Sequence, residues 1–157
     1  MPKLYVLVGV PASGKSTWVA QWAVQQEWIK DCAYISTDQY VEAHAAGLNK
    51  TYNEVFEEVM PACVRKMTDA VVLARTNQQD IIWDQTSTKI ASRKKKFNML
   101  PDYYKIAVVF PVPEDEEHKR RLASRPGKII PQRVLIQMIN GYESPTLEEG
   151  FDEIWNT

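Results

Sequence analysis

The chain has 157 residues, of which 45% are hydrophobic and 25% are charged, and its formal net charge is −1. This is the balance of an ordinary globular protein, and the length predicts a single domain over residues 1–157. The near-zero charge excludes a strongly basic surface for tight non-specific nucleic-acid binding, and no apolar run is long enough to span a membrane. Because no leader pattern precedes the first predicted strand, we expect a cytoplasmic protein without membrane association.

A glycine-rich segment follows the first predicted strand. The apolar run 4–8 is typical of a strand buried on both faces of a parallel sheet, and apolar residues recur at helical spacing over 18–23, which predicts a helix that ends near residues 27–30. The segment between them satisfies the pattern G-x-x-x-x-G-K-S/T in full, in the strand-to-helix context of a phosphate-binding loop. The free N–H groups and the dipole of the helix N-terminus favour an anion there. We expect a nucleoside triphosphate to bind the motif residues Gly9, Pro11, Ala12, Ser13, Gly14, Lys15, Ser16 and Thr17.

Three residues at the end of this segment have distinct predicted roles. Lys15 is expected to lie along the β- and γ-phosphate oxygens, where its charge assists catalysis. Ser16 is expected to ligate Mg²⁺ through its hydroxyl, and Thr17 to add a backbone donor near the α-phosphate. The motif therefore predicts a bound nucleoside triphosphate together with Mg²⁺.

The second predicted strand, 32–36, delivers Asp38 to the carboxyl edge of the sheet. Ligands of open α/β sheets bind beyond that edge, so the topology brings Asp38 close to the phosphate-binding loop. An aspartate between a strand and a helix also commonly caps the helix, because its carboxylate satisfies free backbone donors. The residues leave both interpretations open. A brief helix over 40–46 is predicted next, followed by a turn over 47–50.

A long helical pattern then runs from about Asn53 to Arg75. Pro61 lies within it and predicts a kink or a restart near Met60. We interpret the apolar stripe of this helix as core packing, without a chemical role. The stripe consists of Phe56, Met60, Cys63, Met67, Val71 and Ala74.

The next apolar run, 80–84, ends in Asp84. A buried strand that ends in an aspartate is the pattern of a Walker B element, whose carboxylate orients Mg²⁺ or a metal-bound water. The pattern is common by itself and gains weight beside a complete phosphate-binding loop. Asp84 is therefore a candidate for catalysis and for metal binding.

A polar loop connects this strand to a helix. Thr86 in the loop is a candidate for substrate contact, and Ser87 or Thr88 is expected to cap the helix, which ends near Met99. The helix carries the one basic run of the chain, which either holds a phosphorylated substrate or forms a solvated face. Arg93 lies nearest the loop and is the candidate for substrate binding.

The fourth predicted strand, 106–110, leads into a helix with acidic residues in its first turn and basic residues in its last. This order complements the helix dipole, as it would in a purely structural helix. Arg121 and Arg125 lie four residues apart, just before the turn residues 126–127. Such a helix also suits a lid that brings arginines over a transferring phosphoryl group, with Arg125 in contact with the nucleotide.

Two further elements complete the predicted fold. A helix is expected between Pro131 and Gly141, and an edge strand over 151–155. The sequence therefore predicts an α/β fold of the P-loop NTPase type. We expect a three-layer sandwich with a mostly parallel sheet of about five strands and a helical lid.

Several segments together resemble a known group of P-loop kinases. These segments are VGVPASGKSTW, STDQY, IIWDQTSTKIASRKKK, RLASRPGK and PTLEEGFDEIW. Their order and spacing are similar to those of the phage polynucleotide kinase domain over nearly the whole chain. The Asp-Gln-Thr segment and the closing LEEGFDEI also resemble the nucleotide-binding domain of the heterogeneous nuclear ribonucleoprotein U proteins.

The resemblance to the kinases implies a role for each motif residue. Asp38 matches the general base that acts on the acceptor hydroxyl, Asp84 matches the acid that assists the site, and Arg121 and Arg125 match the lid arginines. The implied reaction transfers the γ-phosphate of ATP, with Mg²⁺, to the 5′-hydroxyl end of single-stranded DNA or RNA. One departure is Val41, where the phage pattern has an arginine that holds the 3′-phosphate side of the acceptor.

Two other functions stay open. The near-zero net charge and Val41 favour a kinase of a small metabolite or mononucleotide. The ribonucleoprotein resemblance favours a non-catalytic, ATP-gated RNA-binding module, against which Asp38 argues because that type lacks the base. The chain carries no phosphatase or ligase motif, so a role in end repair would require a separate end-healing or ligase partner.

Overall fold

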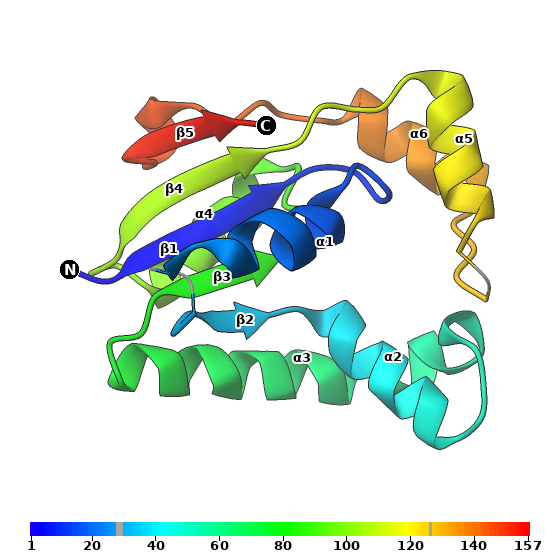
Figure 1. Cartoon of the computed structure of the whole chain (residues 1–157), viewed down its shortest axis with the longest axis horizontal. Helices are drawn as coiled ribbons and strands as arrows, with labels where there is room; N and C mark the ends of the chain where they lie inside the picture. Colours follow the sequence, from blue (N-terminus) through cyan, green and yellow to red (C-terminus); the bar gives the residue numbers. More distant parts are fainter. Residues whose placement is uncertain (28–29, 126) are drawn as a thin grey trace.

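The computed structural model of the chain describes residues 1–27, 30–125 and 127–157. Its centre is a five-stranded sheet in which neighbouring strands run parallel, in the order β2-β3-β1-β4-β5 (Figure 1). This architecture confirms the predicted α/β class, the number of strands and the edge position of the last strand. The strands are β1 (Lys3–Val8), β2 (Ala33–Ile35), β3 (Ile81–Asp84), β4 (Tyr104–Val109) and β5 (Glu153–Asn156).

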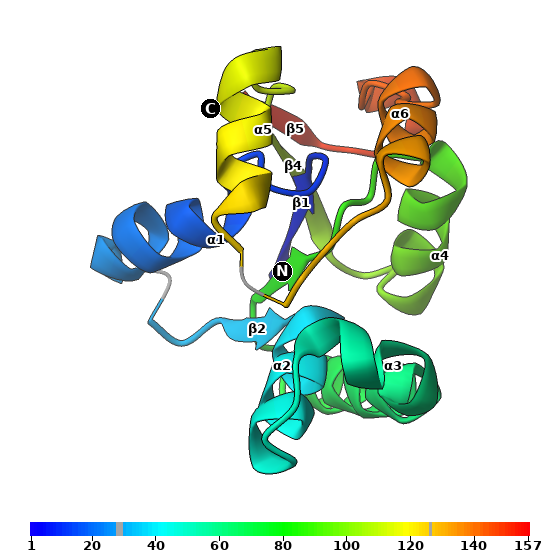
Figure 2. The same ribbon diagram turned by 90° about the vertical axis from the view of Figure 1, so that its right-hand side faces the viewer.

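Helices cover both faces of the sheet and its carboxyl edge. In Figures 1 and 2, α2, α5 and α6 gather beyond the ends to which the strand arrows point. No helix in the described ranges is long and apolar enough to cross a membrane. The helices are α1 (Lys15–Thr17), α2 (Thr37–Gly47), α3 (Tyr52–Thr76), α4 (Ile90–Met99), α5 (Asp115–Ala123) and α6 (Gln132–Asn140), with short helical turns η1 (Trp18–Trp22), η2 (Ala23–Gln25) and η4 (Leu147–Glu149).

The central strand β1 is buried on both faces. Leu4 and Val6 pack into the cluster that α3 and α4 cover, whereas Tyr5 and Leu7 pack into the opposite cluster with Ala23 of η2. Each of these five residues is at most 1% exposed. A strand enclosed in this way needs apolar side chains at successive positions, which explains the uninterrupted apolar run in the sequence.

The helical segment that follows the glycine-rich loop is shorter and less regular than predicted. The short helix α1 continues as the π-helical turn η1 and the 3₁₀ turn η2, so the segment ends at Gln25. The predicted end was in the window 27–30, of which residues 28 and 29 lie outside the described part of the chain. Within η1 the indole rings of Trp18 and Trp22 stack, with centroids 5.0 Å apart.

The long helix α3 is continuous, so the predicted restart near Met60 does not occur. The helix runs through Pro61 as one element of 25 residues. Its start is fixed by a capping box between Thr51 and Glu54, in which each residue's side chain accepts a hydrogen bond from the other's backbone N–H at 3.4 Å. Packing of a buried face therefore outweighs the one backbone hydrogen bond that proline removes.

The buried face of α3 begins one residue earlier than the predicted stripe. Val55 and Val59 are buried, whereas Phe56 is 37% exposed. Val55 and Val59 pack against Val41 of α2, which is fully buried. The prediction missed this shift because the face that contacts α2 differs from the face that contacts the sheet.

The first turn of α4 is capped from elsewhere in the chain. The N-cap residue is Lys89, whose side chain makes no capping hydrogen bond, so the prediction of Ser87 or Thr88 is wrong. The backbone N–H of Ile90 donates instead to Glu143 Oε1 at 3.3 Å. A carboxylate 53 residues away in sequence therefore satisfies this helix terminus.

Arg93 has a structural role in place of the predicted substrate contact. Its side chain is 0% exposed, pairs with Glu149 through Nε–Oε1 (2.5 Å) and Nη2–Oε2 (3.0 Å), and donates to the carbonyl oxygen of Ser87 at 2.9 Å. Lys96 is also buried, with its Nζ 5.1 Å from the centroid of the Trp83 ring. The basic run therefore does not form a fully solvated face, because the side chains of Arg93 and Lys96 are buried.

Candidate active site

The loop between β1 and α1 lies at the carboxyl edge of the sheet, and its backbone depends on two glycines. A Cβ atom on Gly9 would lie 2.5 Å from Ser13 Oγ, and Gly14 has a φ of 104°, in the region that favours glycine. The backbone N–H of Gly9 donates to the carbonyl oxygen of Thr86 at 2.9 Å. This hydrogen bond brings the segment after β3, including Thr86, against the loop.

Lys15 turns its ammonium group back toward the loop. Its Nζ donates to the carbonyl oxygens of Gly9 and Val10, each at 3.0 Å. Burial lowers the pKa of Lys15 to about 8, while the charges of Asp84 and Asp38 oppose that change. A half-buried cation with two neutral acceptors gains from the arrival of an anion, so Lys15 suits a phosphate ligand.

Asp84 ends β3 directly beside the start of the loop. It is paired in register with Leu7 of β1, and it is 7% exposed. The hydroxyl of Tyr34 on β2 donates a hydrogen bond to Asp84 Oδ2. Burial raises the pKa of Asp84, and the Tyr34 hydrogen bond and the charge of Lys15 counteract this rise. The carboxylate is therefore held in place by its neighbours on both adjacent elements.

Ser16 and Asp84 are the residues that could hold Mg²⁺. Ser16 is exposed in the first turn of α1, immediately after Lys15. Mg²⁺ in phosphotransfer sites is typically held by one or two protein oxygens, with phosphate oxygens and waters in the other positions, and a hydroxyl with a carboxylate matches that donor set. The described ranges contain no group of three or more His, Cys, Asp or Glu side chains that could hold a metal ion.

Asp38 lies in the first turn of α2, also at the carboxyl edge. Ser36 is the N-cap of this helix, so the alternative in which Asp38 caps it is wrong. The Asp38 carboxylate accepts hydrogen bonds from two side chains of other elements. Tyr52 Oη donates to Oδ1 at 2.6 Å, and Lys128 Nζ donates to Oδ2 at 3.2 Å. The carboxylate is half exposed and close enough to Lys15 to act on its pKa.

The sequence pattern did not point to Tyr52 or Lys128. Tyr52 begins α3, and Lys128 lies 90 residues after Asp38, between α5 and α6. The burial of Tyr52 and its hydrogen bond to Asp38 both raise the pKa of the tyrosine, so its hydroxyl stays protonated and remains a donor. Neither residue belongs to a motif: the packing of α2 on α3 brings Tyr52 to the aspartate, and the segment between α5 and α6 brings Lys128.

The predicted lid helix α5 contacts the loop through two side chains. His118 is 4% exposed, and its Nε2 lies 2.8 Å from the carbonyl oxygen of Pro11. Arg121 Nη1 donates to the carbonyl oxygen of Ala12 at 3.3 Å, while its Nε donates to Glu117 at 2.8 Å. The sequence indicated Arg121 but gave no signal for His118, because a single histidine within a charged helix is a common pattern.

Arg125 follows α5 and acts electrostatically on Lys15. Its Nη1 is buried and has no hydrogen-bond partner in the described part of the chain. Its charge acts to lower the pKa of both Lys15 and Tyr52. A buried guanidinium nitrogen with no partner among the described residues, whose charge acts on a half-buried lysine, fits an anionic ligand. The predicted turn over 126–127 lies partly outside the described residues, since residue 126 is not described.

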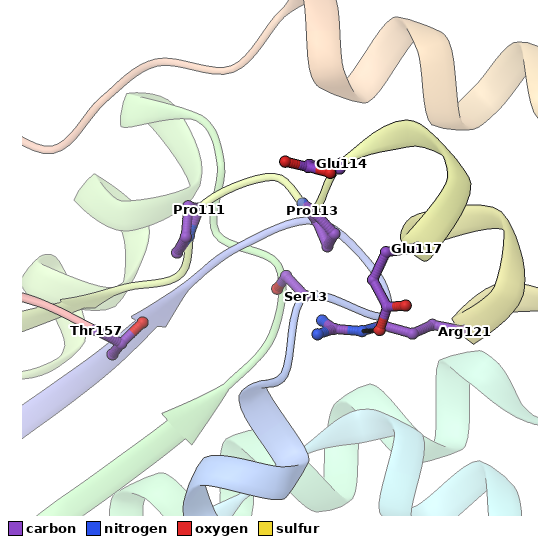
Figure 3. A pocket seen from close by; sticks show the side chains of 7 residues that line it. All are labelled: Ser13, Pro111, Pro113, Glu114, Glu117, Arg121 and Thr157. Carbon is purple, nitrogen blue, oxygen red and sulfur yellow. Dashed lines mark hydrogen bonds and ion pairs between the residues drawn. The ribbon is translucent and has the colours of Figure 1, made fainter.

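A pocket of about 340 Å³ adjoins the loop on the α5 side (Figure 3). Figure 3 shows the Arg121 guanidinium pointing from α5 toward the loop, with Glu117 beside it. The pocket is lined by Ser13, Pro111, Pro113, Glu114, Glu117, Arg121 and Thr157. Its mixed apolar and polar lining next to a phosphate-binding loop is suited to the organic part of a nucleotide.

The family of the chain follows from a match over most of its length. Residues 4–145 match the family described as "AAA domain". The chain belongs to this AAA domain family. This match, together with the parallel sheet and the glycine-rich loop, confirms the P-loop fold that the sequence predicts. The fold of the chain is that of P-loop kinases.

Individual relatives of this AAA domain are distant. Heterogeneous nuclear ribonucleoprotein U-like protein 2 of Mus musculus is 21% identical over 160 residues, which cover 97% of the chain but 21% of the relative. A chain of the Pnkp1/Rnl/Hen1 RNA repair complex has 21% identity and a TM-score of 0.67, with 89% of this chain and 43% of that one covered. Chaetomium thermophilum Kti12 in complex with ADP-AlF3 has 16% identity and a TM-score of 0.63, with 98% and 88% covered. These similarities establish a shared fold. They do not identify the group that would accept a phosphate.

Proposed function

We propose that this protein transfers the γ-phosphate of ATP to a hydroxyl group, and that the acceptor is the 5′-hydroxyl end of a DNA or RNA strand. The observation that carries the proposal is the arrangement of Asp38 and Arg125 around Lys15. The Asp38 carboxylate and the Arg125 guanidinium, whose Nη1 is buried without a hydrogen-bond partner among the described residues, both act electrostatically on the lysine of the P-loop. A site of this kind offers cations to a phosphoryl group and a base to an attacking hydroxyl.

ATP would bind with its phosphates in the loop 9–17. Lys15 would exchange the carbonyl oxygens of Gly9 and Val10 for β- and γ-phosphate oxygens. The pocket beside Ser13 would take the base and ribose. Ser16 and Asp84 would hold Mg²⁺, which supplies charge neutralisation between the β- and γ-phosphates when bound.

The transfer step forms one bond and breaks another at the γ-phosphorus. The acceptor oxygen bonds to phosphorus, the bond between phosphorus and the β,γ-bridging oxygen breaks, and ADP leaves. Asp38 accepts the proton of the acceptor hydroxyl, for which each carboxylate oxygen keeps a free lone pair beyond its bond to Tyr52 or Lys128. Lys15, Arg121 and Arg125 stabilise the charge on the transferring group.

The choice of a nucleic-acid end rests on the resemblance of the motifs to polynucleotide kinases and on the similar fold of a chain in an RNA repair complex. A separate end-healing or ligase partner would supply the other steps of repair. Kinase activity on a small metabolite or mononucleotide is the second candidate. This candidate is favoured because Arg93 of α4 and Val41 of α2 are both buried. Neither position therefore offers an accessible cation to the backbone of a long nucleic acid.

Transfer of labelled γ-phosphate to a panel of acceptors tests the proposal. The panel contains 5′-hydroxyl DNA and RNA oligonucleotides, nucleoside 3′-monophosphates and free nucleosides, with Asp38→Asn as the control. We expect labelled oligonucleotides, a turnover about 10²- to 10⁴-fold lower in Asp38→Asn, and unchanged ATP affinity in that variant. Labelling of small acceptors alone would support the second candidate. ATP and RNA binding without transfer to any acceptor would support an ATP-gated RNA-binding module.

A further inference from the structure

Gln85 joins the carboxyl end of β3 to the start of α2. Its side-chain Oε1 accepts a hydrogen bond from Trp83 Nε1 at 3.1 Å, and its Nε2 donates to Thr37 Oγ1 at 3.2 Å. An indole N–H only donates, so the amide oxygen must face Trp83 and the amide nitrogen must face Thr37. The amide is therefore held in one orientation by two buried partners, Trp83 and Thr37.

The register of the sheet brings these side chains together. Ile35 of β2 pairs with Trp83 of β3, and the two strands run parallel (Figure 1). Thr37 and Gln85 each follow by two residues, so they come side by side just beyond the strand ends. The N-cap residue of α2, Ser36, makes no capping hydrogen bond through its side chain. The bond from Gln85 therefore fastens a helix start that has no side-chain cap of its own.

The two carboxylates of the site are the chain neighbours of this contact. Asp84 precedes Gln85, and Asp38 follows Thr37. Burial raises the pKa of Asp84 and the charge of Asp38 adds to this rise, so the two carboxylates lie within electrostatic reach of each other. Like charges repel, and a movement of α2 away from β3 would relieve that repulsion. The hydrogen bond from Gln85 to Thr37 opposes this movement.

The other partners of Asp38 do not connect it to the sheet. Tyr52 belongs to α3, and Lys128 belongs to the segment between α5 and α6. The P-loop, in contrast, follows β1, whose neighbour in the sheet is β3. A contact between β3 and the start of α2 therefore places the proposed base relative to the phosphate-binding loop.

We propose that Gln85 is a positioning residue, which sets the distance of Asp38 from the transferring phosphoryl group by holding Thr37. The inference rests on the proposed function and adds a residue to its machinery. Transfer requires the acceptor oxygen to lie close to both the base and the phosphorus, and a displacement of about 1 Å can cost about 10²-fold in rate. Gln85 acts on the reaction through Thr37 and the backbone of α2. Its loss should therefore lower turnover and leave nucleotide affinity as it is.

Substitutions of similar shape break the contact from either side. Gln85→Met removes the amide, and Thr37→Val removes the hydroxyl. Thr37→Ser keeps the hydroxyl, and Gln137→Met at an exposed position of α6 is the matched control. We expect kcat with a 5′-hydroxyl oligonucleotide to fall about 10- to 100-fold in Gln85→Met and Thr37→Val, and by less than about 3-fold in the other two. The affinity for ADP, measured by calorimetry, should change by less than about 3-fold in all four.

The double variant Gln85→Met with Thr37→Val shows whether the two residues act through one contact. In that case it should be about as slow as the slower single variant, because the same hydrogen bond is lost. Losses that multiply in the double variant would overturn the inference. An unchanged kcat in either single variant, or an equal loss of ADP affinity, would also overturn it.

Amide hydrogen exchange over 36–40 tests the contact without an acceptor. We expect exchange there to accelerate about 5-fold or more in Gln85→Met and Thr37→Val, and to match the wild type in Thr37→Ser. A wild type that binds ADP but transfers phosphate to no acceptor would refute the proposed function, and exchange then decides the inference alone. Accelerated exchange in both variants would support the hold of Gln85 on α2, and unchanged exchange would overturn it.

Discussion

His118 Nε2 lies 2.8 Å from the carbonyl oxygen of Pro11, although 107 residues separate the two in sequence. A carbonyl oxygen only accepts hydrogen bonds, so Nε2 carries the proton in this contact. Together with the hydrogen bond from Arg121 to the carbonyl oxygen of Ala12, it fastens α5 to the phosphate-binding loop. Any movement of α5 away from the loop must break both contacts, so the loop and α5 are mechanically coupled.

The first prediction concerns this coupling. His118→Phe keeps an aromatic ring in the buried position but leaves the carbonyl oxygen of Pro11 without its donor. Loss of a buried hydrogen bond costs about 1–3 kcal/mol, so we expect ATP to bind about 5- to 150-fold more weakly and amide exchange over 9–17 to accelerate. Lys119→Ala removes an exposed ion pair from the same helix and serves as the control. Unchanged exchange in the loop of His118→Phe would contradict the coupling.

The pH dependence of ATP binding is the second prediction. Burial lowers the pKa of Lys15 to about 8, and the phosphates bind only its charged form well. The affinity for ATP should therefore be constant below pH 7 and weaken as the pH rises through 8, to about tenfold weaker at pH 9. Lys15→Arg should bind ATP without this loss, because arginine stays charged throughout. Calorimetric titrations between pH 6.5 and pH 9.5 measure both, and a flat wild-type profile would contradict the prediction.

The third prediction concerns the hydrogen bond from Tyr34 to Asp84. Tyr34→Phe removes a contact that lowers the pKa of Asp84, so the variant's carboxyl should protonate at higher pH than the wild type's. A protonated carboxyl does not ligate Mg²⁺. As the pH is lowered, the Mg²⁺ concentration that nucleotide binding requires should therefore begin to rise at a higher pH in Tyr34→Phe than in the wild type. Tyr104→Phe loses a comparable bond to Glu153 at the far edge of the sheet and is the control. Titrations with Mg²⁺ from pH 5 to pH 8 give the two profiles, which should differ for Tyr34→Phe alone.

The sheet and the loop could be predicted because their signals are local. The apolar run of β1 and the spacing from Gly9 to Ser16 are set by burial on two faces and by the needs of a phosphate cradle. Asp38 and Asp84 could be assigned to one edge because parallel strands end at the same edge. These features depend on residues within one or two elements, which a sequence displays directly.

The partners of these residues could not be predicted because they come from distant packing. Tyr52 and Lys128 reach Asp38 from 14 and 90 residues away, and neither lies in a recognisable pattern. The basic run was misread for the same reason. A charged helix face looks solvated in sequence unless its counter-ion is known, and Glu149 lies 56 residues after Arg93.

The last prediction tests the structural role of Arg93. Arg93→Ala leaves Glu149, which is 6% exposed, as a buried charge without its cation, and such losses cost about 3–5 kcal/mol of unfolding free energy. The double variant Arg93→Met with Glu149→Leu removes both charges and should recover most of that loss, because well-packed apolar residues often replace buried ion pairs at little cost. Lys95→Ala changes an exposed neighbour and should alter the unfolding free energy by less than about 0.5 kcal/mol. Urea unfolding measures all three, and the acceptor KM of the folded double variant should equal that of the wild type. A stable Arg93→Ala protein with a raised acceptor KM would instead return Arg93 to the substrate site.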